Sequence, residues 1–278
     1  MNNTMYRSLL LRPALGLAIA LAAWSPLQAG AQSAAPTGAW HFGGSIYGYL
    51  PTLSGSSTIP ADAAGTPIEV DASQILDKLK FTFMGSLDAH NGRWGGFTDV
   101  MYLDLGNSKD QSRAFTIGNA GLPADTTAHI EWDLKGLVWT TAGEYRLVSL
   151  PEFTLDGLAG ARLLALKQTI KWNISGSLGS IAAAGRTGES STNMSLWDAI
   201  AGVKGRYAFN DRWSLPFYAD IGTGQSDLTL QAAAGVSYGY SWGEITAMYR
   251  YLSYDMKSGK ALNNLKFNGP MIGATFRW

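Results

Sequence analysis

The sequence predicts an all-β protein, a ten-stranded antiparallel transmembrane β-barrel, with eight or twelve strands as the alternatives. Three observations lead to this fold class. The 278-residue chain holds 33 Gly, 10 Trp, 12 Tyr and 10 Phe, a balance that suits strands and tight turns. Segments in which apolar and polar residues alternate recur along it. The connections between these segments alternate between long and short, which is typical of transmembrane barrels.

The N-terminus has the features of a secretory signal peptide. Arg7 and Arg12 flank the start of an apolar run, and Ala29-Gly30-Ala31 has small residues where signal peptidase cuts. The run is shorter than the roughly 20 residues of a membrane-spanning helix. We therefore expect a cleaved signal peptide at 1–31, a disordered leader at 32–39 and the barrel at 40–278. A retained N-terminal anchor is the alternative.

The charge and cysteine content give no support for a nucleic-acid-binding protein or for a disulfide-stabilised secreted protein. The chain has 21 Lys and Arg, 21 Asp and Glu, and no Cys. The balance of charge gives no indication of a nucleic-acid partner. An exported chain without cysteine has no disulfide framework, so its own core or a membrane must hold it together.

The connections between the ten expected strands indicate their orientation. Counting along the chain, the even-numbered connections have 3, 6, 4 and 3 residues, and the odd-numbered ones have 29, 23, 23, 5 and 10. Bacterial barrels have short periplasmic turns and longer external loops, and an even strand count places both termini in the periplasm. The expected strands span residues 40–50, 80–90, 94–105, 129–147, 154–172, 196–208, 213–222, 228–240, 244–254 and 265–278.

Tryptophan follows the short turns, as in "HNGRW" at 90–94, "NDRW" at 210–213 and "SWG" at 241–243. The Asn-Gly pair predicts a tight hairpin with positive φ at both residues. Aromatic side chains at strand ends mark the membrane boundary, although the same residues would also suit the core of a soluble β protein. One expected girdle adds Trp40, Tyr207, Tyr240 and Trp278, and the other comprises Tyr49, Tyr102, Trp132, Trp172, Trp197 and Tyr251.

Alternation assigns one face of each strand to lipid and the other to the lumen. In the strand at 228–240, for example, Val236 falls on the apolar face and Gln231 on the polar face. Ten strands leave a packed or narrow interior, in which charges of opposite sign should pair. The register of Asp99 is ambiguous. The expected lumen charge network is Asp88, Asp99, Arg162, Asp198, Lys204, Arg206, Asp220, Arg250 and Arg277.

The first long loop contains one expected helix, "DASQILDKL" at 71–79. Asp71 would cap it with Gln74 reaching back, and Ile75, Leu76 and Leu79 would form an apolar stripe. A helix of two turns needs a packing surface, so we expect a lid or plug at the barrel mouth. An extended loop end leading into the next strand is the alternative.

A catalytic constellation is largely missing from the sequence. "HIEWD" aligns His129, Glu131 and Asp133 on one strand face, where the histidine could serve as a general base. His41 and His90 fall at strand ends as boundary residues. No nucleophile elbow, metal-binding helix or phosphate loop is present, so no metal, cofactor or enzymatic activity is expected.

Several segments carry a family resemblance: "FTFMGSLDAHNGRWGGFTDVMYLDL", "LAGARLLAL", "MYRYLSYDM" and the ending "GPMIGATFRW". Over 40–278 the chain resembles a family of poorly characterised proteobacterial outer-membrane β-barrel proteins. The resemblance implies that the last strand is a signal for the outer-membrane assembly machinery. That signal would comprise Ile272, Ala274, Phe276 and Trp278 on the lipid face. Most such barrels end in Phe, so Trp278 departs from the pattern.

The sequence therefore predicts a porin-like protein of the Gram-negative outer membrane, either structural or a narrow pore for passive passage of small solutes. The expected partners are outer-membrane lipid, lipopolysaccharide and the assembly machinery, and the oligomeric state is left open. One alternative is a hydrolase at the external rim, which rests on fold analogy. The other is a surface binding or adhesion module that uses the long loops.

Overall fold

The computed structural model describes residues 38–57, 66–106, 127–178, 181–258 and 262–278. Within these ranges some side chains, including those of His129, Trp132 and Trp172, lie outside the description. All of these residues belong to one compact unit, Ala35–Trp278. The expected signal peptide at 1–31 lies outside the described residues, as does the leader up to residue 37.

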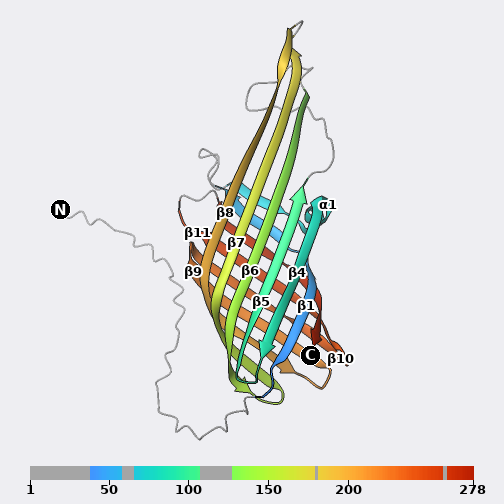
Figure 1. The fold of residues 1–278 in the computed structure, drawn as a ribbon, viewed down its shortest axis with the longest axis vertical. Helices are drawn as coiled ribbons and strands as arrows, with labels where there is room; N and C mark the ends of the chain where they lie inside the picture. The colour runs from blue at the N-terminus through green and yellow to red at the C-terminus, as the bar shows by residue number, and fades with distance from the viewer. Residues whose placement is uncertain (1–37, 58–65, 107–126, 179–180, 259–261) are drawn as a thin grey trace, which may run out of the picture. The chain divides into compact units, whose positions relative to one another are not determined.

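Ten antiparallel strands close into a barrel, because β1 pairs with β4 on one side and with β12 on the other (Figure 1). The predicted fold class, ten strands with a short helix, is confirmed. The barrel strands are β1 (His41–Tyr49), β4 (Leu79–His90), β5 (Trp94–Gly106), β6 (Thr127–Ser149), β7 (Phe153–Leu178), β8 (Ile181–Ala208), β9 (Trp213–Gly224), β10 (Ser226–Tyr240), β11 (Gly243–Met256) and β12 (Leu262–Arg277).

Two further strands lie where the sequence predicted a long loop. β2 (Thr52–Ser57) continues β1 past Pro51 and pairs with β12, with Leu53 opposite Phe267. β3 (Thr66–Val70) then pairs with β2. Proline lacks the amide that a strand needs, so it divides one long strand into β1 and β2. The sheet thus holds twelve strands, of which ten close the barrel.

Strands β6, β7 and β8 run well past the ends of their neighbours (Figure 1). The sequence placed a connection at 173–195, but all of it except 179–180, which lie outside the described residues, is strand in β7 and β8. Pairing continues out to Leu178 opposite Ile181. This part of the chain is rich in Ser, Thr and Gly on both faces, so no alternation marks it as strand. The other long connection, 107–126, is outside the described residues.

The two faces of the strands follow the predicted alternation. Val236 on β10 is exposed on the outside of the barrel, whereas Gln231 is buried inside it. The turn-end aromatics are all exposed, as a girdle requires: Trp40, Trp94, Tyr207, Trp213, Tyr240, Trp242 and Trp278. In the other girdle Trp197 is exposed, but the assignment of Tyr49 was wrong. Its side chain is only 4% exposed, because Tyr47 and Tyr49 share the inward face of β1.

Two of the short turns are closed by asparagine side chains. Asn91 Oδ1 accepts hydrogen bonds from the backbone N–H of Arg93 at 3.2 Å and Trp94 at 2.8 Å. Asn210 does the same for Arg212 and Trp213. Gly92 has a φ of 90°, and no described residue other than glycine has a positive φ. The predicted positive φ at Asn91 was therefore wrong, because its side chain closes the turn instead.

The helix α1 (Ala72–Lys78) lies in the first long loop, next to β5. Asp71 is its N-cap, and Gln74 Oε1 accepts a hydrogen bond from the Asp71 backbone N–H at 3.3 Å, as predicted. Ile75 is buried, but Leu76 is 50% exposed, so the predicted apolar stripe is narrower. Among the described residues, no helix is long and apolar enough to cross a membrane.

Candidate functional site in the lumen

One half of the barrel interior is filled by apolar side chains. Leu164, Leu196 and Leu252 have no solvent-exposed surface, and neither has Tyr254. Leu164 and Leu196 are direct cross-strand partners on β7 and β8, and they meet Leu252 from β11 in one cluster. The whole cluster comprises Tyr47, Tyr49, Met84, Met101, Val138, Leu164, Leu196, Leu252, Tyr254, Met256 and Leu265. We call it the apolar plug.

A layer of buried polar groups lies directly below the apolar plug. Arg162 precedes Leu164 on the same strand face and forms an ion pair with Asp220 of β9, with neither side chain exposed. Its Nε donates to Thr140 Oγ1 at 3.1 Å, and its Nη1 donates to Thr229 Oγ1 at 3.2 Å. Burying a guanidinium without such partners would cost several kcal/mol, on the order of a buried ion's desolvation penalty.

Arg250 organises the second part of this polar layer. Its Nη2 donates to Asp99 Oδ1 at 3.0 Å and to Gln231 Oε1 at 2.9 Å. The hydroxyl of Tyr47 receives a hydrogen bond from Arg250 Nη1 and donates one to Asp99 Oδ2 at 2.7 Å. These contacts place Asp99 inside the barrel, although its register was ambiguous in the sequence. Together the two arginines connect seven strands: Arg250 connects β1, β5, β10 and β11, and Arg162 connects β6, β7, β9 and β10.

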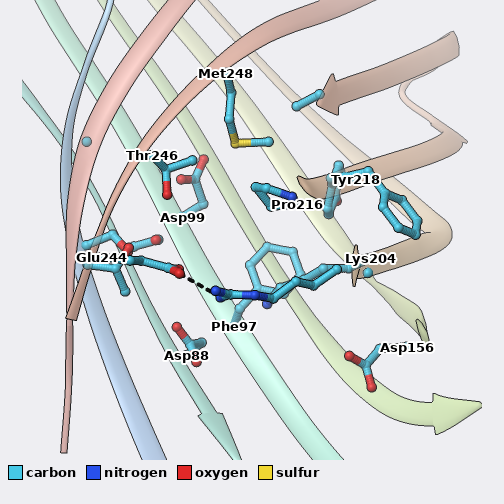
Figure 2. Close-up of a pocket in the computed structure, with 18 of the residues that line it drawn as sticks. Asp88, Phe97, Asp99, Asp156, Lys204, Pro216, Tyr218, Glu244, Thr246 and Met248 are labelled. Atoms are coloured by element: carbon cyan, nitrogen blue, oxygen red, sulfur yellow. Dashed lines mark hydrogen bonds and ion pairs between the residues drawn. The ribbon is translucent and has the colours of Figure 1, made fainter. Parts of the chain in front are cut away.

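Below this layer the interior opens into a cavity of about 700 Å³ (Figure 2). Its charged side chains pair across the lumen: Lys204 Nζ lies 2.9 Å from Glu144 Oε1, and Arg206 Nη1 lies 2.6 Å from Glu244 Oε2. Arg277 reaches the other oxygen of Glu244 at 2.6 Å. The Arg277 side chain is 56% exposed, so the cavity communicates with solvent at the end of the barrel that holds the chain terminus.

The nine residues expected in the lumen all lie on the interior side of the wall. Eight of them take part in the contacts of the polar layer or the cavity, including Asp198, which accepts a hydrogen bond from the Ser226 backbone N–H at 2.8 Å. Asp88 lines the cavity without an ion-pair partner among the described residues (Figure 2). The structure therefore brings the nine residues into one barrel interior but into two separate layers.

Five further residues form ion-pair contacts in the cavity and were not among the expected ones. Arg146 Nε contacts Asp156 Oδ1 at 2.5 Å, and His90 Nε2 lies 3.4 Å from the same oxygen. Glu144 and Glu244 are the others. The alternation of residues along the strand could have identified Glu244, because it lies on the same strand face as Arg250. His90 was assigned to the boundary from its place at the strand end, but its ring points inward.

Of the three expected catalytic residues of the rim, the structure describes the side chains of Glu131 and Asp133. The side chain of His129 is outside the description, and Glu131 is exposed. Asp133 forms an ion pair with Lys80. Glu131 and Asp133 share the strand face of Lys135 and Trp139, which is the outside of the barrel. Among the described residues no group of three His, Cys, Asp or Glu side chains could hold a metal ion.

These features define a class of protein. A closed barrel with an apolar outer surface and exposed aromatic side chains at the strand ends leaves no unpaired edge in lipid. Leu87, Ile221 and Ile272 are each more than half exposed on that outer surface. The chain is an outer-membrane β-barrel protein, and its location is the bacterial outer membrane.

Comparison with known proteins adds no family name. No protein-family model matches the sequence, and no curated protein matches it. Among solved structures, the chain is similar to the outer membrane protease OmpT from Escherichia coli, at 9% identity and a TM-score of 0.43, covering 87% of this chain and 98% of that one. It is similar to the translocator domain of the autotransporter NalP from Neisseria meningitidis, at 16% identity, a TM-score of 0.40 and coverage of 88% and 91%.

A third similar structure is Ail, the attachment invasion locus protein of Yersinia pestis, at 14% identity and a TM-score of 0.34, covering 87% of this chain and 99% of that one. None of these similarities carries an activity over to this chain.

Proposed function

We propose that the protein is a structural outer-membrane barrel whose lumen is closed in its resting state. The observation that carries this proposal is the complete burial of Leu164, Leu196 and Leu252 across the interior. A solute that enters the cavity from the periplasm meets the buried arginine layer first and then the apolar plug. Passive passage of small solutes then requires these layers to move apart.

Opening the lumen costs free energy in both layers, for a different reason in each. An ion that reaches the apolar plug loses its hydration without gaining a polar partner. In the polar layer, Arg162 and Arg250 already have all their acidic partners close by, so moving either one separates a buried pair. Both layers consist of strand side chains. Helix α1, expected as the lid, contributes no residue to the plug.

Single-channel recording in planar bilayers tests the proposal. We expect no conductance steps from the folded wild-type protein. Leu164→Gly with Leu196→Gly removes a facing pair from the plug, and we expect this variant to show steps. The matched control, Leu137→Gly with Leu163→Gly, removes two leucines from the outer face of β6 and β7 and should stay closed. Regular steps from the wild-type protein would contradict a closed lumen.

Folding of each variant has to be verified before the recording. Heat-modifiable migration on a gel reports barrel closure, because a closed barrel keeps its compact form in detergent until it is boiled. Should the double glycine variant fail this assay, Leu252→Ala alone shortens a third side chain of the plug. The proposal expects conductance from that variant too, at a smaller amplitude.

The rim-hydrolase alternative has weaker support in the structure. Glu131 or Asp133 would have to orient the imidazole of His129, and the carboxylate of Asp133 contacts the Lys80 ammonium. The surface-binding alternative depended on two long loops. One of them, at 173–195, is largely a strand hairpin, so it offers an extended sheet rather than a loop.

A further inference from the structure

Two lysines face each other on the outer surface of the barrel. Lys135 on β6 and Lys167 on β7 are direct cross-strand partners, and both are exposed. Side chains in such positions lie about 5 Å apart at their Cβ atoms, and like charges there destabilise the pair. A bound anion or an acidic neighbour reduces this repulsion between the two lysines.

The acidic neighbours neutralise only part of this charge. Lys135 Nζ lies 3.1 Å from Asp104 Oδ2 on β5, and Asp133 is paired with Lys80. On its other side Lys167 faces Asn193 of β8, which carries no charge. Lys171, four residues further along the same face of β7, faces Glu131 on one side and Glu189 on the other. The excess positive charge is therefore at Lys167.

These lysines border a recess in the outer wall, with a volume of about 460 Å³. Its apolar part includes Leu137 and Ala165, and its polar part includes Asn193 and Tyr102. The two lysines form the charged end of the recess, and Leu137 and Ala165 form its apolar end. We call it the Lys135–Lys167 recess.

The position of the recess along the strands matches the level of lipid headgroups. Trp139 lies four residues from Lys135 on the same face of β6, which corresponds to about 13 Å along a strand. Trp139 packs edge-on against Trp197, with 5.8 Å between the ring centroids, and both are exposed. Exposed tryptophan marks the boundary between acyl chains and headgroups. The two lysines lie on the external side of that boundary.

We propose that the Lys135–Lys167 recess binds the phosphate group of an outer-leaflet glycolipid, the lipid A portion of lipopolysaccharide. A phosphate monoester carries between one and two negative charges and accepts several hydrogen bonds. Two ammonium groups with one nearby carboxylate complement that charge. The acyl chains run past Leu137 and Ala165 toward Trp139. The assignment rests on the outer-membrane location and external orientation, and it does not depend on whether the lumen is closed.

Native mass spectrometry of the full-length protein in phosphatidylcholine nanodiscs tests this assignment, with diphosphoryl lipid A as the probe. We expect a bound lipid on the wild-type protein. Lys167→Met keeps the length of the side chain and removes its charge. It should weaken binding about tenfold, the loss expected for one charge-assisted hydrogen bond. The matched control is Lys171→Met, two residue pairs away between its two glutamates, and it should bind as the wild type does.

Three further measurements decide the source of the anion and the validity of the site. Lipid A without its phosphates should not bind, and inorganic phosphate at the same concentration should not displace the lipid. Equal retention by Lys167→Met and Lys171→Met, in variants that pass the heat-modifiable assay, would overturn the site. Displacement by inorganic phosphate would overturn the lipid assignment in favour of a simple anion site. A conducting wild-type barrel would overturn the closed lumen and leave this result untouched.

Discussion

The contribution of an ion pair to the stability of this barrel depends on whether the pair is buried in the lumen or exposed on the rim. The side chains of Arg162 and Asp220 are fully buried, and Arg162 also bonds to hydroxyl groups from two other strands. Lys80 and Asp133 form an ion pair on the outer rim, where both side chains remain about a third exposed. Water and salt screen the rim pair, and they do not reach the lumen pair.

Replacing Arg162 by Met should therefore destabilise the barrel by about 3–5 kcal/mol, because Asp220 is left as a buried charge without its partner. The matched control, Lys80→Met, should cost less than about 1 kcal/mol. Urea unfolding in phospholipid vesicles, followed by tryptophan fluorescence, measures both. Adding Asp220→Leu to Arg162→Met should restore much of the loss, since no charge is then buried. Similar small effects from both single variants would show that water reaches the lumen pair.

At the scale of one element, β12 shows how the barrel closes. The backbones of Trp278 and Phe42 exchange two hydrogen bonds, of 3.1 and 2.9 Å, just beyond the last paired residues of β12 and β1. The rings of the same two residues stack with 6.4 Å between their centroids. The final residue is thus part of the seam between the first and the last strand.

We propose that this seam makes the aromatic ending an assembly signal as well as a closing contact. Trp278→Ala should lower the fraction of heat-modifiable protein in the outer-membrane fraction several-fold. Trp278→Phe should assemble like the wild type, because it keeps a ring that can stack on Phe42. Trp94→Ala removes an equally exposed aromatic from another turn and serves as the control. Normal assembly of Trp278→Ala would count against the signal.

At the scale of the whole barrel, the long strands β6 to β8 form a separate region. Beyond Asp133, where β5 ends, the outer residues of β6 pair only with β7. The outermost residues of β7 and β8, such as Asn173 opposite Thr187, pair only with each other and β6. The ten-strand closure does not include this region.

Removing residues 172–187 should consequently leave the barrel intact. The deletion joins Lys171 to Gly188, which are diagonal neighbours in the present register, so a short turn can connect them. We expect unchanged heat-modifiable migration and an unfolding midpoint close to that of the wild type. Failure of the shortened chain to reach the membrane would show that the extension takes part in folding.

Much of this architecture could be predicted because it follows from local patterns. The period of two in β9 to β12 assigns Val236 and Ile272 outward and Gln231 and Arg277 inward without any knowledge of their neighbours. The cap of α1 is equally local, since Asp71 and Gln74 are three residues apart. Local patterns failed in β7 and β8, where polar residues occupy both faces, and at Pro51, where one strand becomes two.

The sequence by itself determined the ten barrel strands near their centres and the face on which most of their charges fall, because both depend on neighbours within a few residues. Only the tertiary structure decided which charges meet. Tyr47, Asp99 and Arg250 are separated by as many as 203 residues, and barrel closure brings them within hydrogen-bond distance. The same closure brings Leu164, Leu196 and Leu252 together to block the lumen, because an interior of ten strands has room for little more than its own side chains.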